Sequence, residues 1–246
     1  NLASARLGLD LGLETVVETL ARLGVTDGVK GVPALTLGAG EYSPLAMASL
    51  YQSIAAGGYR MPLRSIRDVT DAHGETLSRY FVDYERTASL QATYLLQYAM
   101  MEVVQEGTGR GVYRYLPDDF AVAGKTGTTN DGRDSWFAGF SGDLVAVTWI
   151  GRDDNGGTGL TGSSGALKIW GDFMAAASRQ PLRYQQPEGI AWAHVDTTNG
   201  YATGKGCPNS RKLPFVSGSE PRRSTNCSGR DKDASGIGDW FRRLFK

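Results

Sequence analysis

Three strand-like segments, at 119–128, 134–141 and 144–152, follow one another with only short polar or glycine-containing connections between them. The connection between the last two is Gly142-Asp143. A connection of this length can join two antiparallel strands, whereas parallel strands need a crossover of a dozen or more residues. The three segments are therefore predicted to form an antiparallel meander.

Helical patterns flank the predicted meander on both sides in the sequence. Leucine and valine recur at helical spacing over 13–23, and Gly24 suits the C′ position. Ser43-Pro44 is a typical N-cap and N1 pair for a helix that stops at Gly57-Gly58. Ser89 is expected to cap a helix that runs to Gly107.

One more helix is predicted over 165–177, and a β-hairpin over 65–82. The helix is expected to turn one apolar face to the core, made of Ala166, Ile169, Trp170, Phe173 and Met174. Strands covered by helices predict an α+β fold, with an antiparallel sheet and helices packed on it.

The first predicted strand ends in Gly124-Lys125-Thr126-Gly127-Thr128, a sequence suited to binding a carboxylate. Lys125 would bring positive charge. Alternation along a strand puts the hydroxyls of Thr126 and Thr128 on the same side, where they could bind the anion together. Gly127 between them has no Cβ, so another backbone or a substrate could approach closely.

Two nucleotide-binding alternatives fail on spacing. A phosphate-binding P-loop needs a glycine five residues before Gly124, where this chain has Asp119. The stretch 157–162 has the form G-x-G-x-x-G, but it does not directly follow a strand, and no acidic residue ends a following strand about 20 residues on. We interpret 157–162 as a flexible loop.

The order of several motifs resembles the transpeptidase domain of class A (bifunctional) penicillin-binding proteins, in particular the 1b-type enzymes. Lys-Thr-Gly is one of the three signatures of serine acyltransferases that react with penicillin. The similar segments are 37–48, 103–110, 123–130 and 134–140, and the resemblance covers roughly residues 1–180. It implies a penicillin-binding/serine β-lactamase-like fold.

Two parts of the family's pattern are missing or incomplete. No serine in the chain is followed by lysine three positions on, so the nucleophile motif Ser-x-x-Lys is absent from this sequence. Asn1 resembles the last residue of the second motif, Ser-x-Asn, followed by a helix. A chance match of an arbitrary first residue is the alternative. We expect the nucleophile-bearing part of the domain to precede Asn1.

The resemblance implies a peptidoglycan D,D-transpeptidase that cross-links stem peptides through a serine acyl-enzyme and is acylated by β-lactams. Lys125, Asn1 and Thr128 would serve catalysis, with the Thr128 N–H as part of an oxyanion hole. Residues Lys125 to Thr128 would bind the substrate. The alternatives are a D,D-carboxypeptidase or β-lactamase of the same fold, and a non-catalytic penicillin-binding or partner-binding module.

Partners and location follow from the same resemblance. They are stem peptides of lipid II-derived glycan strands, β-lactams, the upstream part of the protein with Ser-x-x-Lys, and a cell-wall lipoprotein or divisome protein. The expected location is the periplasmic face of the inner membrane, with a single-pass anchor and a glycosyltransferase domain upstream. A net charge of zero gives no argument for nucleic acid. No cofactor or metal is expected.

Residues 1–185 are predicted to be the C-terminal portion of the transpeptidase domain, and 186–246 a small extension. Cys207 and Cys227 lie in polar, Gly/Ser-rich surroundings of this extension. Because free cysteines are usually buried, this context favours a disulfide and an oxidising compartment. Two unrelated reduced thiols are the alternative.

The end of the chain, 237–246, has an amphipathic pattern. Its apolar residues recur at i, i+3, i+4, i+7 and i+8, and Arg242, Arg243 and Lys246 stand near its end. Ten residues are too few for a stable isolated helix, so the segment is expected to dock on its own domain, a partner protein or an anionic membrane.

Overall fold

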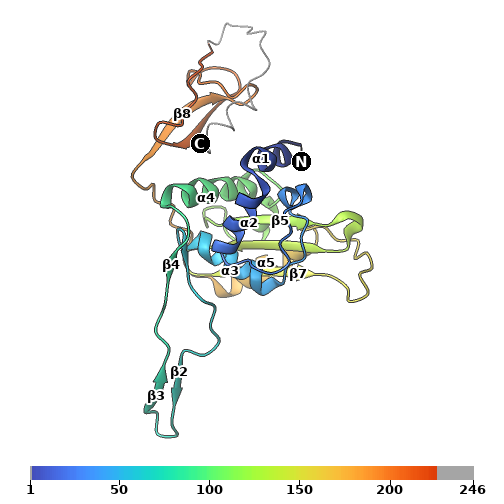
Figure 1. Ribbon diagram of the computed structural model, residues 1–246, viewed down its shortest axis with the longest axis vertical. Helices are drawn as coiled ribbons and strands as arrows, with labels where there is room; N and C mark the ends of the chain where they lie inside the picture. The colour runs from blue at the N-terminus through green and yellow to red at the C-terminus, as the bar shows by residue number, and fades with distance from the viewer. Residues whose placement is uncertain (1, 226–246) are drawn as a thin grey trace. The chain divides into compact units, whose positions relative to one another are not determined.

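The computed structural model describes residues 2–225, and Figure 1 shows the arrangement of its elements. The α-helices are α1 (Leu2–Leu11), α2 (Leu13–Arg22), α3 (Pro44–Ala55), α4 (Leu90–Gln105) and α5 (Ala166–Ala177). The 3-10 helices are η1 (Pro33–Leu37), η2 (Arg110–Arg114) and η3 (Asn130–Gly132). The strands are β1 (Tyr59–Arg60), β2 (Asp68–Thr70), β3 (Thr76–Arg79), β4 (Glu85–Arg86), β5 (Ala123–Thr128), β6 (Ser135–Phe140), β7 (Val145–Ile150), β8 (Ile190–Asp196) and β9 (Ser210–Val216). The predicted α+β class is confirmed.

Contacts divide the chain into two compact units. One contains 18–30 and 40–183 and holds the sheet β5–β6–β7. The described part of the other contains 2–17, 31–39 and 184–225, with the hairpin β8–β9.

The three-stranded sheet is the predicted meander, with strand order β5-β6-β7 and antiparallel pairing throughout. The β5–β6 register is regular, with Lys125 opposite Ala138, Thr126 opposite Phe137 and Thr128 opposite Ser135. The first strand begins at Ala123, four residues later than predicted, because Pro117 to Phe120 form a turn closed by the Phe120 N–H and the Pro117 carbonyl.

Helices cover both faces of this sheet, because apolar side chains of its strands point to both sides (Figure 1). Ala123 and Phe140 pack with Ile54 of α3 and Met100 of α4. Phe137 lies on the opposite face and packs on Trp170 of α5, with ring centroids 4.8 Å apart. Trp170 also donates its indole N–H to the carbonyl of Ala146, so burial leaves no unpaired polar atom on this ring.

The helix ends follow the predicted capping chemistry. The Ser43 hydroxyl accepts from the Ala46 N–H at 3.1 Å, and the Ser89 hydroxyl accepts from the Ala92 N–H at 3.1 Å. Gly24 has φ +104°, the left-handed conformation expected just after a helix. These caps set where α3 and α4 begin, and α4 carries the chain to the sheet.

The apolar face predicted for α5 is only partly correct. Ala166, Trp170 and Met174 are buried, but Ile169 is 54% exposed and Phe173 50% exposed. Leu167 and Gly171 are buried in their place. Since almost every residue of α5 is apolar, the sequence pattern fits two neighbouring faces of the helix equally well, and packing on Phe137 selects one.

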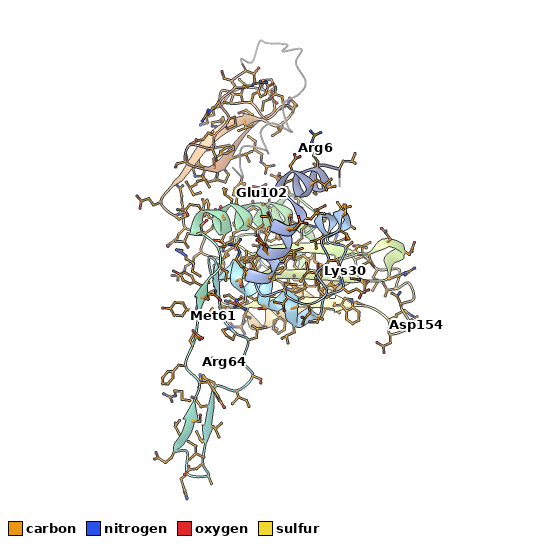
Figure 2. All side chains as sticks on the ribbon, viewed as in Figure 1. Arg6, Lys30, Met61, Arg64, Glu102 and Asp154 are labelled. Carbon is orange, nitrogen blue, oxygen red and sulfur yellow. The ribbon has the colours of Figure 1, made fainter. Side chains whose placement is uncertain are left out.

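The predicted hairpin at 65–82 is present as β2–β3, with its turn at Asp71 to Gly74. Both carboxylate oxygens of Asp68 are paired, with Arg67 and with Arg79, each at 2.9 Å. These bonds hold the pKa of Asp68 below its usual range. At the base of the hairpin, Arg64 donates to the Phe81 carbonyl (Figure 2).

In the second unit, β8 and β9 pair in register from Ile190 opposite Val216 to Asp196 opposite Ser210. Cys207 lies in the turn before β9. Cys227, its predicted partner, and the amphipathic segment 237–246 lie outside the described residues, as does Asn1. In the part of the chain from 2 to 225, no helix has the length and hydropathy that a bilayer crossing requires.

Candidate functional site

Lys125 is exposed, and its ammonium group lies along the outer edge of β5. Nζ donates to the carbonyl of Thr126 at 2.8 Å. The Thr129 N–H donates to Asp134 across the β5–β6 ladder, so alternation directs the N–H groups of Lys125 and Gly127 towards β6. The N–H and C=O groups of Thr126 and Thr128 then point away from β6, to the outer edge of the sheet. The Lys125 Nζ, which bonds to the Thr126 carbonyl, lies on this same edge.

The outer edge of β5 offers the backbone N–H groups of Thr126 and Thr128 to a ligand. Among residues 2–225 the sheet order ends at β5, so no further strand pairs there. The Thr128 N–H, which was predicted to help bind an oxyanion, faces this edge. An extended peptide could add to such an edge as an extra strand.

Each of the two predicted carboxylate-binding hydroxyls has a partner within the chain. Thr126 Oγ1 lies 2.6 Å from Thr108 Oγ1, in the turn after α4. Thr128 Oγ1 accepts from the Gly162 N–H at 2.9 Å, in the loop before α5. Because an N–H can only donate, the proton of the Thr128 hydroxyl stays available for an acceptor.

The segment 157–165, which includes the loop predicted at 157–162, is hydrogen-bonded to the sheet. Thr158 donates to the Gly132 carbonyl through both its N–H, at 2.8 Å, and its hydroxyl, at 2.7 Å. The buried Ser135 hydroxyl donates to the Thr161 carbonyl at 2.7 Å and accepts from the Ala166 N–H at 2.9 Å. These bonds connect β6 with the start of α5 and hold the loop beside β5.

Gly162 lies so close to the sheet that a side chain would not fit there. A Cβ on Gly162 would lie 2.5 Å from the Trp136 carbonyl oxygen and 2.8 Å from that of Gly127. The predicted close approach at Gly127 is therefore present, and the neighbour is the backbone of this loop.

Directly after β7 and before the segment 157–165, Arg152 forms a two-pronged pair with Asp154 through bonds of 2.8 and 2.6 Å. This pair, with the Gly156 N–H, lowers the pKa of Asp154 to about 2. Asp154 lies in the loop between β7 and α5 (Figure 2). The Asp154 carboxylate thus connects Arg152 with the Gly156 N–H in the residues that directly follow β7.

Of the predicted site residues, the structure brings Lys125, Thr126, Gly127 and Thr128 together on one strand. Asn1 and Cys227 lie outside the described residues, so their predicted roles are not tested. Sequence reasoning missed Thr108, Ser135 and Gly162 as neighbours of the strand. The one available signal was Gly107-Thr108-Gly109, a polar residue between two glycines.

Known proteins resemble this chain in sequence over most or all of its length. The family model described as the penicillin binding protein transpeptidase domain matches residues 1–157. Penicillin-binding protein 1B of Escherichia coli (strain K12) is 36% identical over 269 residues, which covers 100% of this chain and 32% of that protein. Penicillin-binding protein 1B of Vibrio cholerae (serotype O1, strain El Tor Inaba N16961) is 38% identical over 256 residues, covering 100% of this chain and 31% of that protein.

A solved structure extends the likeness to three dimensions. The crystal structure of penicillin-binding protein 1A from Haemophilus influenzae superposes with a TM-score of 0.83 at 26% identity, covering 92% of this chain and 39% of that one. The chain spans about a third of the length of the curated relatives named above. The family match covers more than half of the chain and includes the Lys125–Thr128 strand, so this chain belongs to the penicillin-binding protein transpeptidase family.

Proposed function

We propose that the protein to which this chain belongs is a serine-type peptidoglycan D,D-transpeptidase, and that it also carries a glycosyltransferase domain. The chain's similarity over its full length to penicillin-binding protein 1B supports this. The observation that carries the proposal is strand β5, which brings an ammonium group, two hydroxyls and an outward backbone N–H together.

The reaction has two halves. A serine from the upstream part of the protein attacks the D-Ala-D-Ala carbonyl of a stem peptide, the peptide bond breaks, and D-alanine leaves with a proton. An amine of a neighbouring stem then attacks the ester, which forms the cross-linking amide and restores the serine. A β-lactam acylates the same serine and is released slowly.

Residues of this chain bind and orient the donor. The hydroxyls of Thr126 and Thr128 donate to its terminal carboxylate, and Lys125 supplies positive charge. The Thr128 N–H donates to the oxygen that becomes negative in the transition state, and such a donor typically contributes about 3 kcal/mol. Asn1 is proposed as the last residue of the second motif, Ser-x-Asn. The proposed location is the periplasmic face of the inner membrane, with the anchor in the upstream part.

A fluorescent penicillin tests the proposal in the complete protein. Lys125→Ala should slow covalent labelling by more than tenfold without lowering the melting temperature, because the exposed lysine serves the ligand and not the core. Lys168→Ala, which removes an exposed lysine from α5, is the matched control and should label at the wild-type rate. Wild-type labelling of Lys125→Ala would refute the role of this lysine.

The isolated chain provides a second test. Residues 1–246 alone should show no covalent label on a denaturing gel, since the proposed nucleophile is a serine upstream of Asn1. A label that survives denaturation on this chain alone would place the nucleophile within it and contradict the proposal.

A further inference from the structure

The hydroxyl groups of Thr108, in the turn after α4, and of Thr126, on the predicted carboxylate-binding strand, are in direct contact. Their Oγ1 atoms are 2.6 Å apart, although the residues are 18 positions apart in sequence. Thr108 is exposed and Thr126 half-buried. The contact therefore joins the turn after α4 to the strand edge at which a ligand is expected.

The backbone holds Thr108 firmly in this position. The N–H groups of Gly107 and Gly109, on either side of it, both donate to the Val103 carbonyl of α4, at 3.1 and 2.9 Å. A Cβ on Gly107 would lie 2.8 Å from that carbonyl oxygen, so the turn fits only a glycine there without rearrangement. Since Val104 next to it is fully buried, the turn is fixed to the core.

The direction of the Thr108–Thr126 hydrogen bond decides what Thr126 can do for a ligand. A hydroxyl has one proton, and a carboxylate can only accept. If Thr126 donates to Thr108, the Thr126 oxygen presents only a lone pair to a ligand carboxylate. That lone pair repels the negative carboxylate. If Thr108 donates to Thr126, the Thr126 proton is available for the carboxylate.

Thr128 shows the same arrangement with a fixed direction. Its partner is the Gly162 N–H, which cannot accept, so Thr128 always keeps its proton for a ligand. The Thr126 hydroxyl keeps its proton for a ligand in the same way only when Thr108 donates to it. A hydrogen bond received by a hydroxyl also polarises it and strengthens the bond that it donates.

We propose that Thr108 is a positioning residue for the carboxylate of the donor: it donates to Thr126 and thereby turns the Thr126 hydroxyl towards the ligand. Thr108 acts through Thr126 and does not itself touch the substrate. The inference rests on the proposed function, because it needs a ligand carboxylate beside Thr126.

The test uses the complete protein and the second-order rate of acylation by benzylpenicillin. Thr108→Val keeps the shape and removes the donor, and should slow acylation roughly two- to tenfold, the effect of one neutral hydrogen bond. Thr108→Ser keeps a hydroxyl and should react at the wild-type rate. Both variants should melt at the wild-type temperature, since residue 108 is exposed.

Two further measurements separate positioning from a merely structural effect. In a Thr126→Val background, Thr108→Val should have no additional effect, whereas in a Thr128→Val background its effect should multiply with that of Thr128→Val. With benzylpenicillin methyl ester, which has no carboxylate, Thr108→Val and wild type should react equally fast.

Each outcome has a distinct meaning. A Thr108→Val protein that is as fast as wild type with benzylpenicillin, or equally slowed with the acid and the ester, would overturn this inference and leave the proposed function intact. A complete wild-type protein that benzylpenicillin does not acylate at all would overturn the proposed function and the inference with it.

Discussion

The β5–β6 and β8–β9 hairpins are both regular antiparallel ladders, but different parts of the chain stabilise them. β6 is buried along almost its whole length, because α3 and α4 pack on one face of the sheet and α5 on the other. Most side chains of β8 and β9 are half-buried or exposed, and the large buried ones in 184–225 are Ile190, Val195, Tyr201 and Phe215.

The difference indicates why the candidate site lies on the first hairpin. A binding group must be held in place by its surroundings. The β5 threonines are held by turns fixed to α4 and α5, whereas a hairpin with so small a core gains from a covalent bond. The predicted Cys207–Cys227 disulfide is thus proposed as the compensation for a small core.

The largest expected effect is on the buried face of β6. Phe137→Ala should destabilise the sheet-containing unit by about 3–5 kcal/mol, the usual cost of deleting a fully buried aromatic ring. Denaturant unfolding measures this. Val216→Ala on β9, where the side chain is 38% exposed, should stay within about 0.5 kcal/mol of wild type. Equal losses would remove the distinction between the two hairpins.

A smaller and local effect is expected from the cysteines. Cys207→Ser should destabilise the β8–β9 hairpin by up to ~3 kcal/mol, the chain-entropy value for a loop of this size. Amide hydrogen exchange in β8 and β9 should report it, while penicillin acylation stays at the wild-type rate.

The matched control is Cys227→Ser, alone and combined with Cys207→Ser. Both single variants and the double variant should behave alike if the two sulfurs form one bond. Two thiols that react with an alkylating agent in the unreduced, denatured protein would contradict the pairing.

Asp143 gives the sheet-containing unit an acid-sensitive contact. Its carboxylate accepts from the hydroxyls of Ser178 and Ser141 and from the Arg179 N–H, at 2.7, 2.8 and 2.8 Å. The Ser178 hydroxyl, followed by the backbone N–H of Arg179, makes the largest contribution to lowering the pKa of Asp143 to about 2. The contact thus connects the β6–β7 turn with the end of α5.

Because the folded pKa lies below the ordinary value of about 3.9, the stabilisation is complete above pH 4 and is lost as the pH falls through 2. Asp143→Asn should therefore have a lower free energy of unfolding than wild type at pH 7. The difference in free energy of unfolding between the two proteins should decrease between pH 4 and pH 2. Asp172→Asn, at an exposed position of α5, should show no such narrowing. Unfolding curves across this pH range measure both, and a constant gap would contradict the role of the Asp143 charge.

On the second hairpin, the ammonium of Lys212 lies 5.3 Å from the centre of the Trp192 ring. Lys212→Ala should cost about 0.5 kcal/mol, as for an exposed cation–π pair, and Lys205→Ala, at an exposed position outside the strands, should cost less. The free energies of unfolding of the two variants, measured by denaturant unfolding, test this prediction. A larger loss from Lys205→Ala would show that this pairing does not stabilise the hairpin.

The smallest effect on stability is expected at 237–246, beyond the described residues. Deleting this segment should leave penicillin acylation and the melting temperature unchanged but weaken binding to anionic vesicles, because its pattern combines aromatic and basic residues. Neutral vesicles are the control. A drop in melting temperature with unchanged vesicle binding would assign the segment to the protein's own core.

By itself, the sequence determined the features that depend on neighbours along the chain. The caps at Ser43 and Ser89, the glycine that ends α2 and the antiparallel meander each follow from a few adjacent residues and short connections. The Lys125–Thr128 segment was likewise placed on a strand from its own pattern. Local sterics and hydrogen bonding decide such features, so they were predictable.

Only the tertiary structure decided which groups meet across the fold. Helix α5 could bury Leu167 or Ile169, and contact with the sheet selected Leu167. The loop 157–162 has no helix or strand pattern in its sequence, yet Ser135 and Thr128 form hydrogen bonds with it. Thr108 reaches Thr126 because α4 packs beside β5. Each of these contacts joins residues far apart in the chain, and their distance depends on the packing of the whole unit, which no local pattern encodes.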